Sequence, residues 1–474
     1  MLFNSFIFFI FLGIVLPIFY FLPTKSAKNV FLLIASYIFY GYWDWRFCIL
    51  LTITTVVDYF VGQQIFKATE QNKKRFFLII SLTFNLGILG FFKYFNFFVK
   101  SFQDLCSTFG SNVDYFHLNI LLPVGLSFYV FHNISYIVDV YKNEIRPTRN
   151  IIDFGLFVVF FPQLVAGPIG RATVLLPQLS KKLSPTKEQI KEAVVLIIVG
   201  LFRKVMIGDT AGRFVDNIFG DLGHYKSIEI ICGLVLFSVQ IYADFSGYSL
   251  IAMGTAKLFG VELTKNFKQP YLSRNITEFW RRWHISLSSW LKDYLYITLG
   301  GNRKGKTRTY INLFLTMLLG GLWHGASWNF VVWGGVHGIY LAVHKLIQKK
   351  GKIETENIKV FNVKVVFNII LTYLLVLFTW IFFRSTSWDS TGIFFSKIIH
   401  WEKSEYAGWF ITMTATFVFS MFLLDIFEYV SGKYEYMLNI KSRPFRYGLL
   451  SAMFLLTLMY MFQTKSSPFI YFKF

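Results

Sequence analysis

Two histidines and one carboxylate interrupt otherwise apolar stretches of this sequence. His324 ends the run Leu315-Thr-Met-Leu-Leu-Gly-Gly-Leu-Trp-His324 and is followed directly by Gly325. Ionisable residues at membrane depth are costly and are therefore functional candidates, and histidine is the side chain that exchanges protons near neutral pH. We predict that His324 is a general base. A packed histidine bonded to a carbonyl remains the alternative.

Glycines surround this first histidine and allow the backbone to bend or to approach another segment closely. Gly320-Gly321 precedes His324 and Gly325 follows it, and glycine lacks the Cβ that would prevent such an approach. His337 follows thirteen residues after His324, ~20 Å farther along a straight helix. The two histidines can therefore share a site only if the chain turns back.

The second histidine, His284, lies in a stretch that is too polar to cross hydrocarbon and too aromatic for an ordinary solvated loop. The stretch runs from Asn266 to Arg303 and carries tryptophans and tyrosines that suit the headgroup level of a bilayer. Residues 277–297 show an apolar face at helical spacing, which predicts a helix along the inner membrane interface or dipping into the domain. Position alone leaves His284 either an interfacial histidine or a buried site residue.

The carboxylate is Asp244, which lies between the apolar segments Leu234-Val-Leu-Phe and Leu250-Ile-Ala-Met. An unpaired carboxylate at membrane depth would protonate or destabilise the fold. We therefore expect an ion pair or hydrogen bond from Asp244 to a residue of 271–303, most plausibly an arginine. This contact would give Asp244 a structural role that supports the site.

The composition indicates that membrane-embedded helices position these residues. Of 474 residues, 55% are hydrophobic, 20% are aromatic and only 15% are charged, and the mean hydropathy is +0.50. Such a chain cannot cover its surface with polar groups in water, which excludes a disordered, fibrous or cytosolic globular protein. The sequence predicts an all-α, polytopic membrane protein in the lipid bilayer, with 1–474 as one domain.

The apolar runs predict about ten to twelve full spans and one or two partial ones, because several runs are shorter than the ~20 residues of a full span. Phe161-Pro-Gln-Leu-Val-Ala-Gly-Pro168 ends one short run and indicates a broken or re-entrant segment. The net charge of +21 comes from basic clusters between the runs, which is the cytoplasmic-loop pattern rather than a sign of nucleic-acid binding. This pattern places the N-terminus outside.

Other chemistries find no support in the sequence. Cys48, Cys106 and Cys232 are far apart, so neither a disulfide framework nor a zinc knuckle is indicated. The sequence contains no phosphate-binding loop, dinucleotide fingerprint, paired-histidine metal motif or serine-nucleophile elbow. We expect no metal and no bound cofactor.

Seven short motifs occur together in the chain. They are Leu122-Pro-Val-Gly-Leu-Ser-Phe128, Asp244-Phe-Ser-Gly-Tyr248, Phe279-Trp-Arg-Arg-Trp-His284, Trp290-Leu-Lys-Asp-Tyr-Leu-Tyr296, Leu299-Gly-Gly-Asn-Arg303, Gly320-Gly-Leu-Trp-His-Gly325 and Trp333-Gly-Gly-Val-His-Gly338. Together they resemble the membrane-bound O-acyltransferase (MBOAT) family, in particular the bacterial branch that O-acetylates alginate, peptidoglycan and other glycans. The resemblance covers the chain to about residue 345, with core motifs at 119–345. Teichoic acid D-alanyl transferases share the two histidine motifs.

The resemblance implies a ring of transmembrane helices around a central funnel, with His324 as the catalytic residue and His284 in the same central region. It also implies an acyl donor on the cytoplasmic side, expected to be acetyl-CoA. The acceptor would be an extracytoplasmic acetyltransferase partner protein, which completes transfer to a polysaccharide. The expected location is the bacterial cytoplasmic (inner) membrane.

The expected function is therefore acetyl transfer across the membrane for O-acetylation of an extracytoplasmic polysaccharide. The alternative is a non-enzymatic transporter or flippase for acyl groups or lipid-linked sugars, which would predict two symmetric halves that the sequence lacks. Six further residues are candidates for binding the donor or lining its channel: Arg281, Arg282, Trp283, Trp323, Asn329 and His337. Anchoring at the inner leaflet is the simpler explanation for the two arginines.

Overall fold

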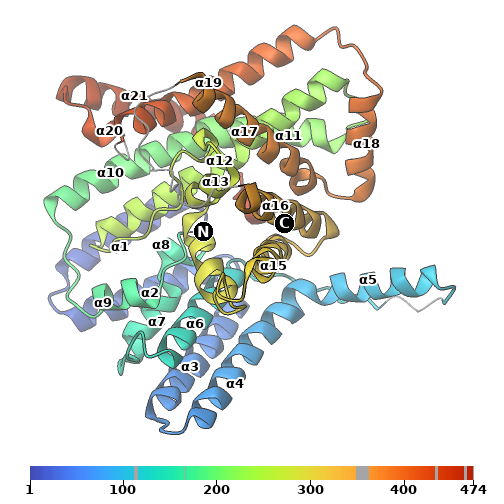
Figure 1. The fold of residues 1–474 in the computed structure, drawn as a ribbon. Coiled ribbons are helices and arrows are strands. Elements are labelled where there is room, and N and C mark those ends of the chain that lie inside the picture. The colour runs from blue at the N-terminus through green and yellow to red at the C-terminus, as the bar shows by residue number, and fades with distance from the viewer. Residues whose placement is uncertain (112–115, 166, 348–361, 433–435, 464–466, 473–474) are drawn as a thin grey trace. The chain divides into compact units, whose positions relative to one another are not determined.

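The computed structural model describes residues 1–111, 116–165, 167–347, 362–432, 436–463 and 467–472. Within these ranges the secondary structure is helical and contains no strand (Figure 1). The chain divides into two compact units. The first comprises residues 1–193, 255–264 and 325–327, and the second comprises 194–254, 265–324 and 328–474.

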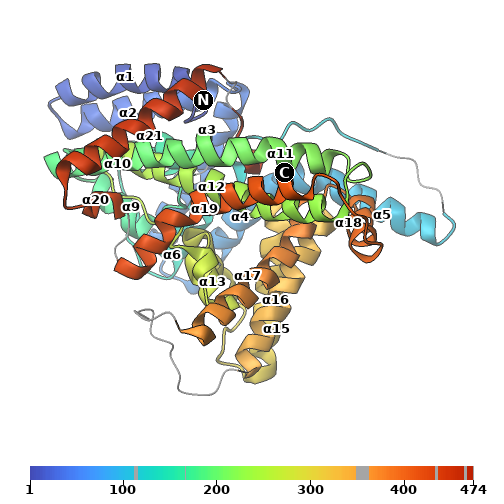
Figure 2. The ribbon, with the colours of Figure 1, turned by 90° about the horizontal axis from the view of Figure 1, so that it is seen from above.

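The first unit is built from the N-terminal helices. They are α1 (Phe6–Phe21), α2 (Lys25–Gly41), α3 (Arg46–Lys67), α4 (Gln71–Leu89), the π-helical turn η1 (Gly90–Tyr94), α5 (Phe95–Thr108), α6 (Leu126–Tyr141), α7 (Ile151–Val159), α8 (Phe161–Leu164) and α9 (Ala172–Leu179). In this unit α3, α4 and α6 pack on one another, and α2 packs on α7. In Figure 2, α1 and α2 run side by side.

The predicted break near Pro162 is present in this first unit. Helix α7 ends at Val159, the short helix α8 stops at Leu164, and the next helix starts only at Ala172. Gly125 lies against this break with φ +75°, and a Cβ on it would lie 2.7 Å from the carbonyl oxygen of Leu164. The break is thus stabilised by a contact that only glycine permits.

The second unit holds the remaining helices and both predicted histidines. Helix α10 (Lys187–Leu201) enters it and continues as the π-helical turn η2 (Phe202–Asp209). The others are α11 (Thr210–Gly220), α12 (Ser227–Leu258), η3 (Pro270–Leu272), α13 (Ile276–Arg282), α14 (Ile285–Trp290), η4 (Leu291–Tyr296), α15 (Lys306–His324), α16 (Trp328–Ile347), α17 (Val363–Arg384), α18 (Trp388–Ile399), α19 (Ala407–Ser431), α20 (Tyr436–Asn439), α21 (Arg443–Gln463) and η5 (Ile470–Phe472).

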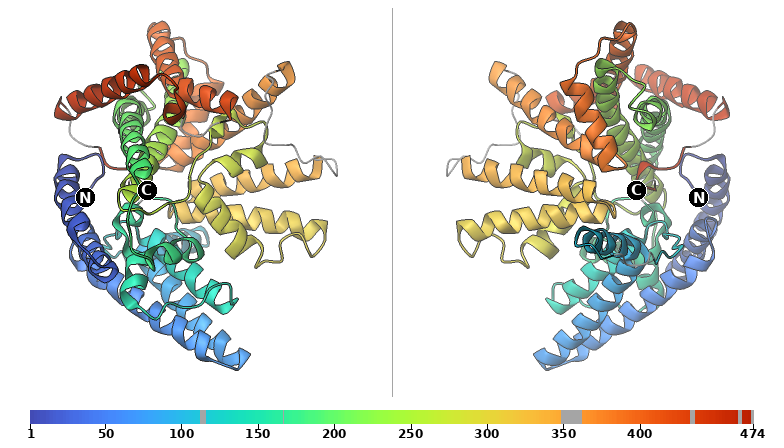
Figure 3. Two further views of the ribbon diagram at one scale, coloured as in Figure 1. Left: turned by 90° about the vertical axis from the view of Figure 1, so that its left-hand side faces the viewer. Right: turned by 90° about the vertical axis from the view of Figure 1, so that its right-hand side faces the viewer.

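Helices α15 and α16 form an extensive helix pair in the second unit, and α17 packs on α16. Figure 3 shows α15 and α16 lying alongside each other, and Figure 2 shows α17 beside them. The short helix α13 contacts both α16 and α17. These four helices carry His324 and position the segment that ends at His284.

Seven helices of the described residues are long and apolar enough to cross a membrane, and two shorter apolar helices accompany them. The seven are 46–67, 71–108, 227–258, 328–347, 363–384, 407–431 and 443–463, and the shorter two are Phe6–Phe21 and Ile151–Leu164. The prediction of an all-helical polytopic membrane protein is confirmed. The number of full-length candidates is lower than the ten to twelve expected, because several apolar runs form short or interrupted helices.

The predicted continuous helix over 277–297 is wrong. Helix α13 ends at Arg282 and α14 starts at Ile285, with His284 between them in the left-handed conformation (φ 42°). From Leu291 the chain continues as the π-helical turn η4. A left-handed backbone is unfavourable for a residue with a Cβ and is found where surrounding packing enforces it.

Candidate active site

The hairpin of α15 and α16 places His324 at the end of a tightly packed helix pair. A Cβ on Gly321 would lie 2.2 Å from the carbonyl oxygen of Phe330, and one on Gly334 would lie 2.3 Å from that of Met317. The expectation of close backbone approach at Gly321 is therefore confirmed. Helix α16 packs alongside α15, so the chain turns back after His324. This turn is what His324 and His337 need in order to lie in one environment.

The imidazole of His324 is buried in a nest of aromatic rings. Its centroid lies 4.9 Å from the ring of Trp323, 5.0 Å from Trp333, 5.4 Å from Phe383 and 5.4 Å from Tyr471. Only 5% of the residue is exposed. Among these four neighbouring rings only Tyr471 carries a hydroxyl, so an imidazole and a phenol share one aromatic enclosure.

His284 is held by its own backbone turn and by apolar contacts. Its Nδ1 accepts the N–H of Leu287 at the start of α14, while its ring lies 4.6 Å from that of Phe245 and 6.3 Å from that of Trp323. Its Nε2 is buried without a hydrogen-bond partner among the described residues. Residue 284 lies outside the candidate spans, and burial lowers the pKa of its imidazole to about 3.

These contacts determine what His284 can do chemically. A neutral imidazole whose Nδ1 accepts a hydrogen bond carries its proton on Nε2. His284 therefore presents a buried N–H donor rather than a proton acceptor. Because Trp323 touches both histidine rings, this donor and His324 flank one indole.

His337 also lies in this aromatic region, but its nitrogens are engaged. Trp280 donates to its Nδ1 at 3.3 Å, which leaves the Nε2–H to donate to the hydroxyl of Thr379 at 3.0 Å. Trp333 lies against both His337 and His324, with ring distances of 4.8 Å and 5.0 Å. His337 thus fixes the tryptophan that packs on His324.

The other candidates for donor binding occupy three kinds of environment. Arg282 is buried and donates to Glu278 at 2.8 Å, whereas Arg281 is exposed. Trp283 is almost fully buried among aromatic rings. Asn329 donates to the carbonyl oxygen of Ser385 at 2.9 Å. Donor binding by these residues stays a prediction.

Asp244 forms the expected ion pair, but the expected partner is wrong. Its Oδ1 lies 2.7 Å from Nζ of Lys204 in η2, and its Oδ2 accepts the backbone N–H of Ile470 at 2.7 Å. Neither partner belongs to 271–303. Two arginines of that stretch, Arg274 and Arg282, instead bind Glu278, which accepts from both.

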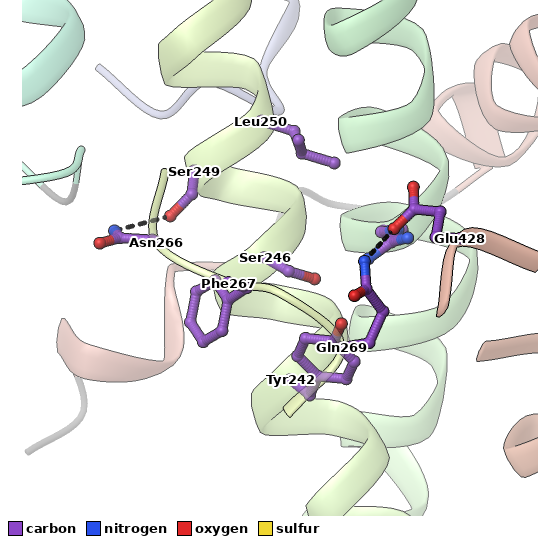
Figure 4. A pocket seen from close by; sticks show the side chains of 9 residues that line it. Tyr242, Ser246, Ser249, Leu250, Asn266, Phe267, Gln269 and Glu428 are labelled. Atoms are coloured by element: carbon purple, nitrogen blue, oxygen red, sulfur yellow. Dashed lines mark hydrogen bonds between the residues drawn. The ribbon is translucent and has the colours of Figure 1, made fainter. Parts of the chain in front are cut away.

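A small polar pocket lies beside α12, the helix that carries Asp244. Tyr242, Ser246 and Ser249 of α12 face Asn266 and Gln269 there. Figure 4 shows Asn266 bonded to Ser249 and Gln269 bonded to Glu428. Asn266 also accepts from the hydroxyl of Ser286 at 2.6 Å, which ties this pocket to the turn that carries His284.

Comparison with known proteins identifies the family. The sequence model of the membrane-bound O-acyltransferase family, MBOAT, matches residues 141–385. The matched residues include Asp244, His284 and His324. The chain belongs to this family. It is a multi-pass membrane protein and an acyltransferase, as predicted.

Two individual relatives cover most of the chain, and a third covers about half of it. A probable alginate O-acetylase of Pseudomonas syringae pv. tomato is 43% identical over 406 residues, covering 84% of this chain and 76% of the relative. A peptidoglycan O-acetyltransferase of Helicobacter pylori is 36% identical, covering 78% and 74%. A teichoic acid D-alanyltransferase of Bacillus subtilis is 26% identical over 245 residues, covering 49% and 62%.

Two residues of this MBOAT site were missed by sequence reasoning. Lys204 lies inside the apolar run 191–215, and the rule that singled out Asp244, an ionisable residue among apolar ones, would have found it. Tyr471 gives no such signal, because it is one aromatic residue in an aromatic-rich sequence. It also lies beyond the matched residues 141–385.

Proposed function

We propose that this enzyme transfers an acetyl group from acetyl-CoA on the cytoplasmic side to an extracytoplasmic acceptor, for O-acetylation of a cell-surface polysaccharide such as alginate or peptidoglycan. The relatives that are named for alginate and peptidoglycan acetylation, and that cover most of the chain, support this substrate class. Membership of an acyltransferase family favours this function over a transporter or flippase.

The observation that carries the proposal is the buried position of His324 against Tyr471, within an enclosure of aromatic rings. In the proposed reaction His324 removes the proton of an attacking hydroxyl. The new C–O bond forms at the thioester carbonyl, the C–S bond breaks, and the thiolate of coenzyme A leaves with the proton from His324. A thioester is already activated, so orientation and a positioned base supply the catalysis.

His284 has a different role in this proposal. Its Nε2–H is buried and has no partner among the described residues, so it is available to a carbonyl oxygen. A donor aimed at the oxygen where negative charge develops stabilises the transition state of acyl transfer. His284 therefore binds the acyl oxygen while His324 handles the proton.

The hydroxyl of Tyr471 belongs to the same reaction. Its ring contacts His324 at 5.4 Å and Phe383 at 6.2 Å. Beside a base, a phenol can carry a proton or act as a transient acyl acceptor. Either role requires its hydroxyl and not only its ring.

The finer features of the proposal follow from the family resemblance and the charge pattern. The helices would surround a central funnel, in the inner membrane of a bacterium, with the N-terminus outside. The gaps predicted to lie outside are short, which supports transfer to the polymer by a separate extracytoplasmic acetyltransferase.

The test of this function compares wild-type protein with His324→Ala at matched membrane level, using labelled acetyl-CoA with the partner protein and several glycans. We expect acetylated glycan only with wild type, and poor acetylation when the partner is omitted. Wild-type acetylation by His324→Ala would refute the base assignment. Movement of donor across the membrane without any acylated product would favour the transporter alternative.

A further inference from the structure

We infer that Lys204 and Asp244 are positioning residues that dock the segment 467–472 onto α12 and thereby hold Tyr471 against His324. This inference rests on the proposed role of His324, because the docked ring is useful only if that site is the reaction centre. The two charged residues contact each other, Asp209 and backbone groups of the segment at Pro468 and Ile470. The segment in turn carries the ring that packs on His324.

The docking contact begins with a buried ionic cluster. Nζ of Lys204 lies 2.7 Å from Oδ1 of Asp244 and also donates to Asp209. The side chain of Lys204 is 0% exposed and that of Asp244 is 4% exposed. Asp244 uses its other oxygen, Oδ2, to accept the N–H of Ile470. The cluster therefore binds the backbone of the segment directly.

The helices that carry this cluster approach each other at glycines. A Cβ on Gly208 would lie 2.9 Å from the backbone nitrogen of Asp244, and one on Gly247 would lie 2.7 Å from that of Lys204. Any side chain at these positions would separate η2 from α12. The close approach keeps a lysine and a carboxylate of two helices within ion-pair distance.

Aromatic contacts place the docked segment beside the site. Phe469 is fully buried and lies 4.8 Å from Tyr248 and 5.2 Å from Phe245. The ring of Tyr471 lies 4.9 Å from that of Phe245, the residue after Asp244. The ring of Phe245 also contacts His284, at 4.6 Å. Thus the surface of α12 at 244–248 supports the segment and both histidine environments.

The energetic coupling between the ionic cluster and the segment is reciprocal. Removal of the segment would leave Oδ2 of Asp244 buried without the donor that it has now, and an unsatisfied buried charge is costly. Conversely, loss of the carboxylate would leave the N–H of Ile470 without its acceptor. A charge-assisted hydrogen bond of this kind changes an equilibrium about tenfold or more.

A purely structural ion pair is the competing explanation, and a cysteine reporter separates the two. In the full-length protein, Cys48 and Cys106 are replaced by alanine, Ile470→Cys reports on the segment, and the natural buried Cys232 of α12 reports on the fold. We measure maleimide labelling of both cysteines in membranes. The Ile470→Cys change retains the backbone N–H that Asp244 accepts.

We expect Asp244→Leu and Lys204→Met to accelerate labelling of the cysteine at 470 about tenfold, while Cys232 stays slow. Asp244→Asn retains an acceptor oxygen and should accelerate it less. Asp425→Leu is the matched control, because it breaks the buried pair of Arg203 and Asp425 without a contact to the segment. Unchanged labelling at 470, or equal acceleration at 232 and 470, would overturn the inference.

A second arm leaves the ionic cluster intact and asks about the reaction. Ile470→Pro removes the N–H donor without changing either charged residue, although it also fixes the backbone at 470. Ile470→Val is its control. We expect Ile470→Pro to lower kcat about tenfold with the KM for acetyl-CoA unchanged, whereas a purely structural pair predicts equal kcat in the two variants. His324→Ala should leave labelling at 470 unaltered, so failure of the proposed function and failure of docking are distinguishable.

Discussion

The ring centroid of Tyr471 lies 5.4 Å from that of His324, although helices α16 to α21 separate the two residues in sequence. The contact places the ring of Tyr471 beside a buried imidazole, in an enclosure otherwise made by Trp323, Trp333 and Phe383. The contact therefore leads to a direct test.

Tyr471→Phe should lower acyl transfer by about a hundredfold or more, the range for loss of a group that acts in proton transfer, at an unchanged level of folded protein. The ring and its packing are retained, so only the hydroxyl is tested. Tyr248→Phe is the control, because Tyr248 is a buried tyrosine that contacts the same segment at Phe469. A wild-type rate for Tyr471→Phe would show that the ring alone matters.

His284 should make the folded protein sensitive to acid. Its folded-state pKa, lowered to about 3 by burial, is below the value of about 6.5 for an unfolded chain. The unfolded state therefore binds more protons below pH 6.5, and stability falls as the pH drops, by up to about 1.4 kcal/mol per pH unit. Above pH 6.5 this contribution is constant.

The measurement is the thermal stability of detergent-solubilised protein at pH 7 and pH 5. Wild type should lose more stability between these values than His284→Asn, which has no titrating ring at that position. His400→Asn is the control, because His400 is exposed. Equal acid sensitivity of wild type and His284→Asn would contradict the buried, neutral state.

Gly334→Ala should lower the amount of folded protein, by about 1–3 kcal/mol of stability as overpacking does. Its Cβ would lie 2.3 Å from a backbone oxygen, that of Met317, so α15 and α16 would have to separate. The adjacent Gly335→Ala is a matched control, since its nearest atom would be Cδ1 of Leu318 at 3.6 Å. Both changes favour helix, so equal folded levels would disprove the close contact.

Arg281 and Arg282 should separate donor binding from folding. Arg282→Gln removes one of the two buried ion pairs of Glu278 and leaves only the pair with Arg274. We therefore expect less folded protein. Arg281→Gln should leave folding unchanged and raise the KM for acetyl-CoA by up to about fivefold, the value of an exposed ionic contact. That increase should shrink at high salt. An unchanged KM would leave Arg281 a membrane anchor.

Local patterns predicted the parts of this site that depend on nearby residues. The apolar run ending at His324 and the glycines beside it predicted a buried histidine and a close helix contact, and Gly321 makes such a contact. The hydropathy of the chain likewise predicted helices long enough to span a membrane. These features need only the period and polarity of neighbouring residues.

Features that depend on distant residues were not predictable in the same way. The partner of Asp244 comes from 202–209 and its second contact from Ile470, and no local pattern specifies such pairs. The helix period continues through 284, so the sequence predicts one helix where the structure has a left-handed turn. Packing of His284 against Phe245 and Trp323 overrides the local preference there.

The anchoring of Ile470 to Asp244 has a consequence for biosynthesis. Translation runs from the N-terminus, so α12, α13 and α15 emerge from the ribosome before residues 467–472 exist. During that interval His324 lacks the ring of Tyr471, and Asp244 lacks the N–H that its second oxygen accepts. Catalytic competence would thus be acquired only after residues 467–472 have been synthesised and have docked onto α12.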